Sequence, residues 1–305
     1  MFCKYLSFDD CDSRKLATFH EYGKQEYLSS DTVCLSTCHR VEFYSDKPIT
    51  LKPPPEFLGC EWNSISGLET VLNRLASIAS GAESKILGEQ FVSFQVVRPF
   101  LRTKISNLPF DLIDGAFEIG SRVKARYNFI TSFSYDDAAF KLFDARPDEF
   151  WKRSLVIIGG GLLGQQIASH VLSREYERVI IITKQIDRCK SDIDSQGGMN
   201  NVEVVTIENA DIPESFDTVF ATTSHDKLYK QKVIDMLRSR VDGSIVDLCA
   251  VPIETPELHE KGSYTCMYDE DFLRLVKISN QLLNHTRDVV TRSIRSEIKA
   301  LMRNG

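Results

Sequence analysis

A cysteine stands in a polar break between two predicted strands. In "LSTCHRVEFY", residues 35–44, the apolar residues on either side are typical of strands, and Cys38 falls between them. Such a thiol can be a packing side chain, a metal ligand or a nucleophile. The eight cysteines show no C-x₂-C spacing and no second spaced ligand pair, so we predict no metal site. The polar setting of Cys38 favours a nucleophile, and a packing role is the alternative.

A glycine-rich turn occurs in the second half of the chain, in "SLVIIGGGLLGQQIASHVLSREYERVIIITK". Gly159, Gly161 and Gly164 form G-x-G-x-x-G between a predicted strand and a predicted helix, which is the setting of a dinucleotide-binding turn. The first glycine allows the tight turn, the second lets the backbone approach a pyrophosphate, and the third permits close helix–strand packing. The helix N-terminus then faces the phosphates. The alternative is a turn of the same fold that binds nothing.

The end of the next predicted strand indicates which dinucleotide binds. NAD-binding proteins carry an acidic residue about 20 residues after the turn, whereas this strand ends in Thr183 and Lys184, with Arg188 close behind. Basic groups suit a 2′-phosphate, so we predict NADPH, with solvated side chains as the alternative. Thr222 and Thr223 follow a later strand-like segment, and their position alone suggests that they lie near the nicotinamide half.

A reactive cysteine and a nicotinamide cofactor together suit one particular chemistry. A thiolate can attack an activated acyl group and form a thioester, which then accepts a hydride and leaves as an aldehyde. A thioester carbonyl is far more electrophilic than a carboxylate, so covalent catalysis divides a difficult reduction into two steps. From the residues alone this is one of several chemistries, and packing is the commoner fate of a single cysteine.

Composition limits the class of protein. The 305 residues suffice for about two domains, and 42% hydrophobic with 26% charged residues is ordinary globular composition. The net charge of −6 excludes a uniformly basic nucleic-acid-binding surface but permits a local basic patch. The N-terminus lacks the pattern of a signal peptide, and no apolar run approaches the roughly 20 residues of a membrane span. We therefore expect a soluble cytoplasmic protein.

The elements that must position these residues follow from periodicity. Residues 1–45 are typical of a small α/β unit, and a proline-rich connector leads to a helical pattern over residues 66–146. Strands and helices alternate from Trp151, which predicts a doubly wound parallel sheet. Residues 271–302 lack proline and glycine and form a long amphipathic helix, whose apolar stripe we expect to pack on residues 66–146.

The fold class is thus α/β, in three parts. They are a catalytic and substrate-binding domain, a Rossmann NADPH domain and a long C-terminal helix, at residues 1–147, 148–268 and 269–305.

Four segments together resemble the glutamyl-tRNA reductase family. "LSTCHRVEFY" is similar to its S-T-C-N-R-x-E-x-Y segment, and "ASGAESKILGEQ" to its A-S-G-L-D-S-x-x-x-G-E-P segment. "VIIGGGLLG" falls where the family has its glycine turn, and "VDLCAVPIETPE" resembles its V-D-[IL]-A-x-P-R segment. The matches occur in family order over residues 33 to about 260. The resemblance implies an enzyme that reduces glutamyl-tRNA with NADPH to glutamate-1-semialdehyde, the first step of tetrapyrrole and heme synthesis.

The resemblance also implies roles for single residues. Cys38 becomes the nucleophile that takes the glutamyl group from tRNA. Arg40 suits a substrate carboxylate, because a guanidinium binds carboxylates bidentately, and Glu42 suits the α-ammonium group. As a regular strand places Arg40 and Glu42 on one face, an ion pair between them is the alternative. The remaining residues that we expect to contact the substrate are Thr37, Glu89 and Gln95.

The sequence departs from the family at several positions. His39 replaces the asparagine after the cysteine, and Asn73 and Arg74 fall where the family has a histidine that could act as general acid. The family continues into a helical dimerisation domain, whereas this sequence ends at Gly305, so we expect a divergent short form that is a monomer. Basic residues of the long helix suit the tRNA, and a downstream aminomutase is the expected recipient of the product.

Two other functions remain open from the sequence. One is a dehydrogenase of a small metabolite in which Cys38 is structural. The other is a catalytically lapsed regulator that binds tRNA or a tetrapyrrole. Turnover without tRNA would indicate the first, and the lost histidine favours the second, against which stand Cys38 and the complete glycine turn.

Overall fold

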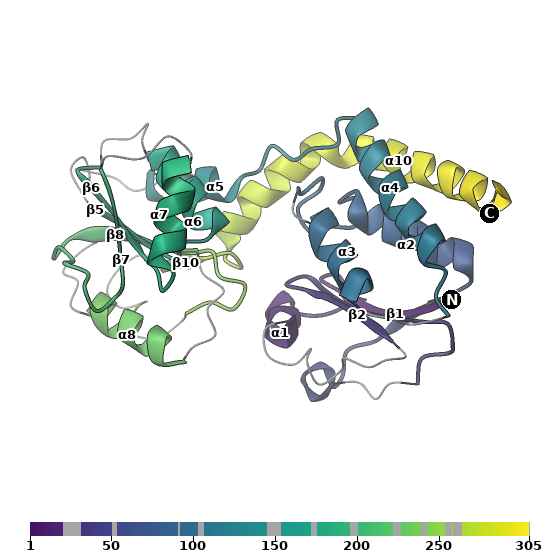
Figure 1. Cartoon of the computed structure of the whole chain (residues 1–305), viewed down its shortest axis with the longest axis horizontal. Coiled ribbons are helices and arrows are strands. Elements are labelled where there is room, and N and C mark those ends of the chain that lie inside the picture. The colour runs from purple at the N-terminus through teal and green to yellow at the C-terminus, as the bar shows by residue number, and fades with distance from the viewer. Residues whose placement is uncertain are drawn as a thin grey trace. The chain divides into compact units, whose positions relative to one another are not determined.

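The chain divides into two compact units. The computed structural model describes residues 1–20, 32–50, 54–90, 92–102, 107–144, 154–171, 176–195, 201–221, 227–238, 243–253, 258 and 264–304. Unit 1 comprises Met1–Ser132 and Val276–Gly305, and unit 2 comprises Phe133–Leu275 (Figure 1).

Unit 1 is built on a four-stranded antiparallel sheet in the order β2-β3-β1-β4. The strands are β1 (Phe2–Ser7), β2 (Val33–Thr37), β3 (Arg40–Ser45) and β4 (Asn63–Ser66). Side chains alternate between the two faces of a strand. Val41 and Phe43 accordingly pack with α1 (Ser13–Thr18) and with the short helix η3 (Pro55–Phe57), while Tyr44 joins the core on the opposite face. Residues 21–31, between α1 and β2, lie outside the described residues.

Helices cover the second face of this sheet. Those against the sheet are α2 (Leu68–Ala79) and α3 (Val92–Arg102), and α4 (Phe110–Arg126) and most of α10 (Glu270–Asn304) pack with them in the same core. Val290, Ile294 and Ile298 of α10 are fully buried in the core that α2 and α4 also form, as Figure 1 shows for the helices themselves. This confirms that the apolar stripe of the long helix packs on the helical part of the same chain.

Unit 2 is a doubly wound parallel sheet in the order β10-β9-β8-β5-β6-β7. Its strands are β5 (Ser154–Ile158), β6 (Arg178–Ile182), β7 (Val202–Val205), β8 (Phe216–Phe220), β9 (Ile245–Asp247) and β10 (Tyr264–Cys266). Its helices are α5 (Tyr135–Asp144), α6 (Leu162–Val171), α7 (Ile186–Ser195) and α8 (Lys227–Arg238). Read from β5 in chain order, the strands have the 3-2-1-4-5-6 arrangement of dinucleotide-binding Rossmann domains. The predicted α/β fold class is confirmed.

The compact units differ in their limits from the three predicted parts. Helix α5 belongs to unit 2, although residues up to 147 were assigned to the first domain. The first turns of the long helix group with unit 2, and the rest of it groups with unit 1. Phe272 illustrates the former: its ring lies 5.5 Å from that of Phe133 and 6.2 Å from that of Tyr135.

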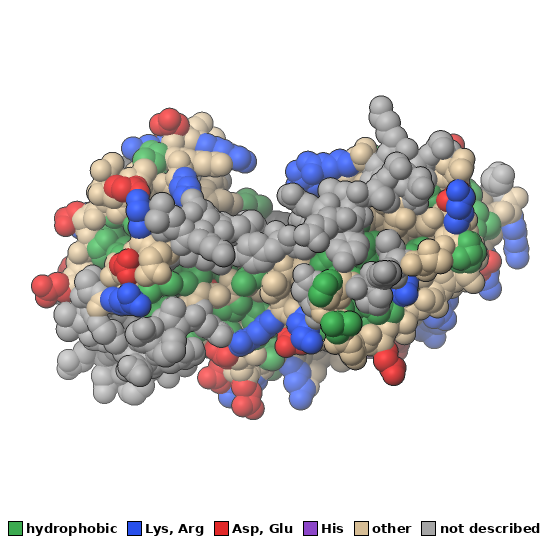
Figure 2. All heavy atoms as spheres, turned by 90° about the horizontal axis from the view of Figure 1, so that it is seen from below, with side chains coloured by type: hydrophobic (Ala, Val, Ile, Leu, Met, Phe, Trp, Pro, Cys, Tyr) green, Lys and Arg blue, Asp and Glu red, His purple; other side chains and the backbone are tan. Residues whose placement is uncertain are grey.

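The described part of the surface carries both signs of charge. On the face in Figure 2, Lys and Arg side chains are interspersed with Asp and Glu side chains. Among the described helices, none combines the length and the apolar character that crossing a membrane requires.

Candidate active site

Cys38 lies at the tip of a two-residue hairpin. Thr37 ends β2 and pairs with Arg40, the first residue of β3, so that Cys38 and His39 alone make the turn. Two-residue hairpins usually contain residues with positive φ, yet neither Cys38 nor His39 has one. The Thr37 hydroxyl accepts a hydrogen bond from the His39 amide at 3.2 Å and so helps to hold the turn. Cys38 is partly exposed, which is the predicted placement at a strand end.

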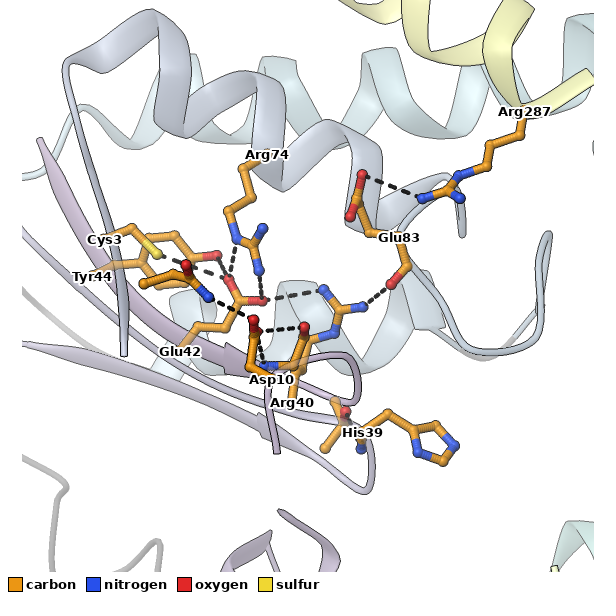
Figure 3. Close-up of polar contacts among 12 residues, drawn as sticks. Cys3, Asp10, His39, Arg40, Glu42, Tyr44, Arg74, Glu83 and Arg287 are labelled. Carbon is orange, nitrogen blue, oxygen red and sulfur yellow. Dashed lines mark hydrogen bonds and ion pairs between the residues drawn. The ribbon is translucent and has the colours of Figure 1, made fainter. Parts of the chain in front are cut away.

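A buried charge network lies under this hairpin, on the α2 face of the sheet (Figure 3). The Glu42 carboxylate is fully buried, and Arg40 Nη1 lies 3.1 Å from its Oε1. Arg74, on α2, reaches the same carboxylate with Nε at 2.9 Å and Nη2 at 2.8 Å. The Tyr44 hydroxyl also donates to it. Arg40 and Glu42 share a strand face, as predicted.

The network settles the charge of Glu42. Burial alone would raise its pKa, but Arg74 and Arg40 outweigh burial, and the pKa is lowered. Both carboxylate oxygens are engaged by protein donors, so the structure shows the ion pair that was the alternative to substrate binding by Glu42. Arg74 stands at the place of the missing family histidine, and sequence reasoning gave it no role. Its guanidinium lies 3.3 Å from the ring centroid of Tyr5.

The loop after α2 carries Lys85, a cation in addition to Arg40 and Arg74. Arg40 donates through Nη2 to the Glu83 carbonyl, which ties this loop to the start of β3. Two residues further, Lys85 Nζ lies 3.5 Å from the Ser13 hydroxyl. Burial lowers the pKa of Lys85, and the charges of Cys38 and Asp12 oppose that change. Lys85 is therefore a half-buried ammonium whose pKa responds to the charge of Cys38, and sequence reasoning missed it.

His39 does not form an ion pair with the thiolate. Its side chain is 6% exposed and its Nδ1 has no hydrogen-bond partner. Burial, Lys85 and Arg40 lower the pKa of His39 to about 3, so the imidazole is neutral near pH 7. Figure 3 shows the ring directed away from Glu42. His39 is thus a neutral polar group at the hairpin, which fits a positioning role better than acid–base catalysis.

One glycine and one asparagine fix the loop that carries Lys85 and Glu89. Gly88 has φ +71°, and a Cβ there would lie 2.7 Å from the Phe129 carbonyl oxygen, so no larger residue fits. Asn280 of α10 accepts from the Leu87 amide at 2.9 Å and donates to the Lys85 carbonyl at 2.8 Å. The loop is therefore held on both sides of Lys85.

Glu89 has the electrostatic character of a group that titrates near neutrality. Burial of its carboxyl raises the pKa to about 7, while Lys124 and Arg40 pull it down. Lys124 Nζ also donates to the Glu89 carbonyl oxygen at 2.6 Å. Gln95 is exposed on α3, and Thr37 is buried beneath the turn.

The glycine turn of unit 2 fits a dinucleotide pyrophosphate. Gly159 follows β5 with φ +121°, and a Cβ on Gly164 would collide with the Gly159 carbonyl oxygen, so α6 packs closely on the turn. A Cβ on Gly161 would meet nothing within 4 Å. Backbone at Gly161 is thus open to a ligand in front of the α6 N-terminus, as the motif predicts.

The residues expected to select the cofactor lie after β6. Thr183 is buried, and its hydroxyl accepts a hydrogen bond from the Gln185 amide at 3.2 Å. A Cβ on Gly160 would lie 2.9 Å from the Thr183 Cβ, so Thr183 packs against the glycine turn. Lys184 and Arg188 are exposed, and Arg188 Nε is 3.8 Å from Asp192. Thr222 and Thr223 lie outside the described residues.

This chain matches one protein family over part of its length and resembles glutamyl-tRNA reductases in sequence and in structure. Residues 141–269 match the shikimate/quinate 5-dehydrogenase family. Over 206 residues the chain is 26% identical to glutamyl-tRNA reductase of Methanosarcina barkeri, covering 63% of this chain and 45% of that protein. A solved glutamyl-tRNA reductase from Methanopyrus kandleri has a TM-score of 0.46 at 18% identity, covering 99% of this chain and 79% of that one.

These matches define a class. The chain is a distant homologue of glutamyl-tRNA reductases, with a Rossmann unit of the kind found in shikimate and quinate dehydrogenases. It is also similar to Protein nfe2 of Rhizobium meliloti, with 28% identity over 276 residues, which cover 87% of this chain and 86% of that protein. The chain spans about half the length of the glutamyl-tRNA reductases from Methanosarcina barkeri and Saccharolobus islandicus, at 45% and 55%.

Proposed function

We propose that the protein reduces glutamyl-tRNA to glutamate-1-semialdehyde, with NADPH as reductant and a thioester on Cys38 as intermediate. The observation that carries the proposal is the Cys38 hairpin: a partly exposed thiol at a strand end that interacts with the Lys85 ammonium. The glycine turn of unit 2 and the distant homology to glutamyl-tRNA reductases support it. The product would enter tetrapyrrole synthesis in the cytoplasm.

In the first step, Cys38 takes the glutamyl group. The ammonium of Lys85 favours the thiolate, which is the nucleophilic form of cysteine. The Cys38 sulfur bonds to the glutamyl carbonyl carbon, and the bond from that carbon to the tRNA ribose oxygen breaks. The ribose oxygen must gain a proton as it leaves, and Lys85 is the donor that we assign. Lys85 thus replaces the family histidine that this sequence lacks.

In the second step, the thioester is released as aldehyde. NADPH, when bound at the glycine turn, supplies the hydride, and Lys184 and Arg188 would hold its 2′-phosphate, with Thr222 and Thr223 near its nicotinamide. As the carbonyl carbon gains hydride, the carbon–sulfur bond breaks and Cys38 leaves as thiolate. Lys85, after it has regained a proton from water that enters when the tRNA leaves, again stabilises the negative charge on that sulfur.

Several residues would recognise the substrate rather than react. Glu89, whose pKa is raised to about 7 by burial, would accept a hydrogen bond from the α-ammonium group in its ionised form. Arg40 and Glu42 would act together, because they form one network with Arg74 that fixes the base of the hairpin. Thr37 and Gln95 complete the proposed substrate contacts. The exposed basic residues of α10, Arg292, Arg295 and Lys299, would meet tRNA phosphates, and the product would pass to an aminomutase.

A second candidate is a dehydrogenase of a small hydroxylated acid. The match of residues 141–269 to the shikimate/quinate 5-dehydrogenase family favours it. In that case Cys38 would be dispensable and tRNA would be irrelevant to turnover. The two candidates therefore differ in whether replacing Cys38 abolishes turnover and in whether turnover requires tRNA.

The experiment is a single-turnover assay with charged glutamyl-tRNA and NADPH, read as semialdehyde. Lys85→Met removes the cation but keeps the stem, and Lys85→Arg keeps the charge. We expect Lys85→Met to lower the rate and also the alkylation rate of Cys38 by iodoacetamide near pH 7, by roughly tenfold for each unit of thiol pKa. Lys85→Arg should restore the alkylation rate. No semialdehyde from the parent protein or from Lys85→Arg, together with reduction of NADP⁺ by a small hydroxy acid, would favour the second candidate.

A further inference from the structure

Two partly exposed cysteines from distant parts of unit 1 meet at their sulfurs. Cys11 lies directly before Asp12, the N-cap of α1, and Cys60 follows η3. Their Sγ atoms are 2.7 Å apart, across a sequence separation of 49 residues. Both side chains are partly exposed, whereas Cys3, Cys34, Cys189, Cys249 and Cys266 are buried. A pair that is in contact and also reachable from solvent is suited to chemistry that the buried cysteines cannot undergo.

We propose that Cys11 and Cys60 form a reversible dithiol–disulfide pair. A disulfide bond joins sulfurs at about 2.03–2.05 Å, so closure requires a small approach of two side chains that the backbone already holds together. Two hydrogen bonds fix the flanking backbone. The Cys60 amide donates to the Phe57 carbonyl at 3.0 Å, and the Cys11 amide donates to the Ser7 carbonyl at 3.1 Å. Neither thiol belongs to the Cys38 site, so the pair does not depend on the proposed function.

The oxidant is a low-molecular-weight disulfide, written RSSR. The thiolate of one cysteine attacks a sulfur of RSSR, forms a mixed disulfide and releases RS⁻. The second cysteine, as thiolate, attacks the protein sulfur of the mixed disulfide and releases the other RS⁻. The two protons lost by the cysteines protonate the two released thiolates. The protein is oxidised by two electrons, and RSSR is reduced to two RSH.

The Cys11 thiol resists deprotonation at neutral pH. Burial, and then the hydrogen bond and charge of Cys60, raise the pKa of Cys11 to about 12. Because only the thiolate reacts, attack by Cys11 accelerates as the pH rises. The disulfide would link two segments of unit 1. One leads into Asp12 and Ser13, which lie next to Lys85, and the other precedes β4.

The experiment exposes the full chain to oxidised glutathione at pH 8, traps free thiols by alkylation and maps disulfides by non-reducing peptide mass spectrometry. We expect a peptide cross-link between Cys11 and Cys60, a fall of two in the eight titratable thiols of the denatured chain, and full reversal by dithiothreitol. Trp62, which packs in the same apolar cluster as both cysteines, should change in fluorescence on oxidation.

The variants separate this pair from every other thiol. Cys11→Ser and Cys60→Ser should each abolish the cross-link, and Cys38→Ser should keep it. Only glutathione adducts on Cys11 or Cys60, a cross-link that involves Cys38, or no loss of thiols after long exposure at pH 8 would overturn the proposal. Semialdehyde formation plays no part in these readouts, so failure here is distinct from failure of the proposed function.

Discussion

Replacing Arg74 by methionine tests the buried network beneath the Cys38 hairpin. Methionine retains an apolar stem of similar length but removes the guanidinium. In the parent protein the Arg74 side chain is 12% exposed and Glu42 is 0% exposed. The substitution leaves the Glu42 carboxylate buried with Arg40 as its remaining cation. We expect a large loss of stability in unit 1, because an ion that is buried without sufficient compensation is costly.

The magnitude follows from the geometry. Removing one partner of a buried ion pair costs about 3–5 kcal/mol. Arg40 remains at 3.1 Å from Glu42, which argues for the lower end. Loss of the contact with the Tyr5 ring adds about 0.5–2 kcal/mol. We therefore expect Arg74→Met to lower the free energy of unfolding by about 3–5 kcal/mol, and the double variant Arg74→Met/Glu42→Gln to lose less than the sum of its parts.

The loss should depend on pH in a defined direction. The pKa of Glu42 is lowered in the folded protein, so its stabilising contribution is complete above the ordinary glutamate pKa, about 4.3. That contribution disappears as the pH falls through the lower folded-state pKa. In Arg74→Met the pKa of Glu42 rises, so less is lost on acidification. The stability difference between parent and variant should therefore shrink as the pH falls below about 4.

The assay is urea unfolding followed by Trp62 fluorescence in a Trp151→Phe background, which leaves one reporter in unit 1. Arg122→Met is the matched control, because Arg122 and Arg126 bracket Glu297 as Arg40 and Arg74 bracket Glu42, but at the surface. Exposed pairs contribute at most about 1 kcal/mol. Equal losses for Arg74→Met and Arg122→Met, or a loss for Arg74→Met that is constant from pH 7 to pH 3, would refute the reasoning.

Three further predictions concern the cofactor, Glu89 and tRNA. NADPH should exceed NADH in kcat/KM, and Lys184→Asp should narrow the gap; equal values in the parent protein would contradict this. Burial raises the pKa of Glu89 to about 7, so its contribution to stability falls as the pH rises from about 4.3 to about 7, and Glu89→Gln should raise the unfolding midpoint at pH 8 but not at pH 4; equal shifts at both would count against it. Affinity for tRNA should fall steeply with salt and drop when Arg292, Arg295 and Lys299 are neutralised together, whereas unchanged affinity would mean that they are only solvated.

Local sequence patterns predicted the features that are determined by residues close together in the sequence. The Rossmann unit follows from an apolar strand, a glycine spacing and a helix within about 30 residues, and the structure has those elements. The shared face of Arg40 and Glu42 follows from strand alternation. The position of Cys38 between two strands was likewise visible, because polar residues interrupt the strand pattern there.

Contacts made by packing left no local signal. Arg74 reaches Glu42 because α2 lies across the sheet, and they are 32 residues apart. Lys85 is held where the charge of Cys38 affects its pKa, because Arg40 and Asn280 fix its loop. A lysine in a loop is ordinarily a solvated charge, so its type and spacing could not reveal this placement. Such residues become visible only when the helices are placed on the sheet.

The most direct test of the central claim is mass spectrometry of the intact protein, quenched in acid after mixing with charged glutamyl-tRNA in the absence of NADPH. The account predicts a glutamyl adduct whose peptide maps to Cys38, which disappears on addition of NADPH together with release of semialdehyde. Cys38→Ser should fold and bind NADPH but show no adduct and no product. Near-normal turnover by Cys38→Ser, or an adduct on another residue, would contradict the thioester mechanism.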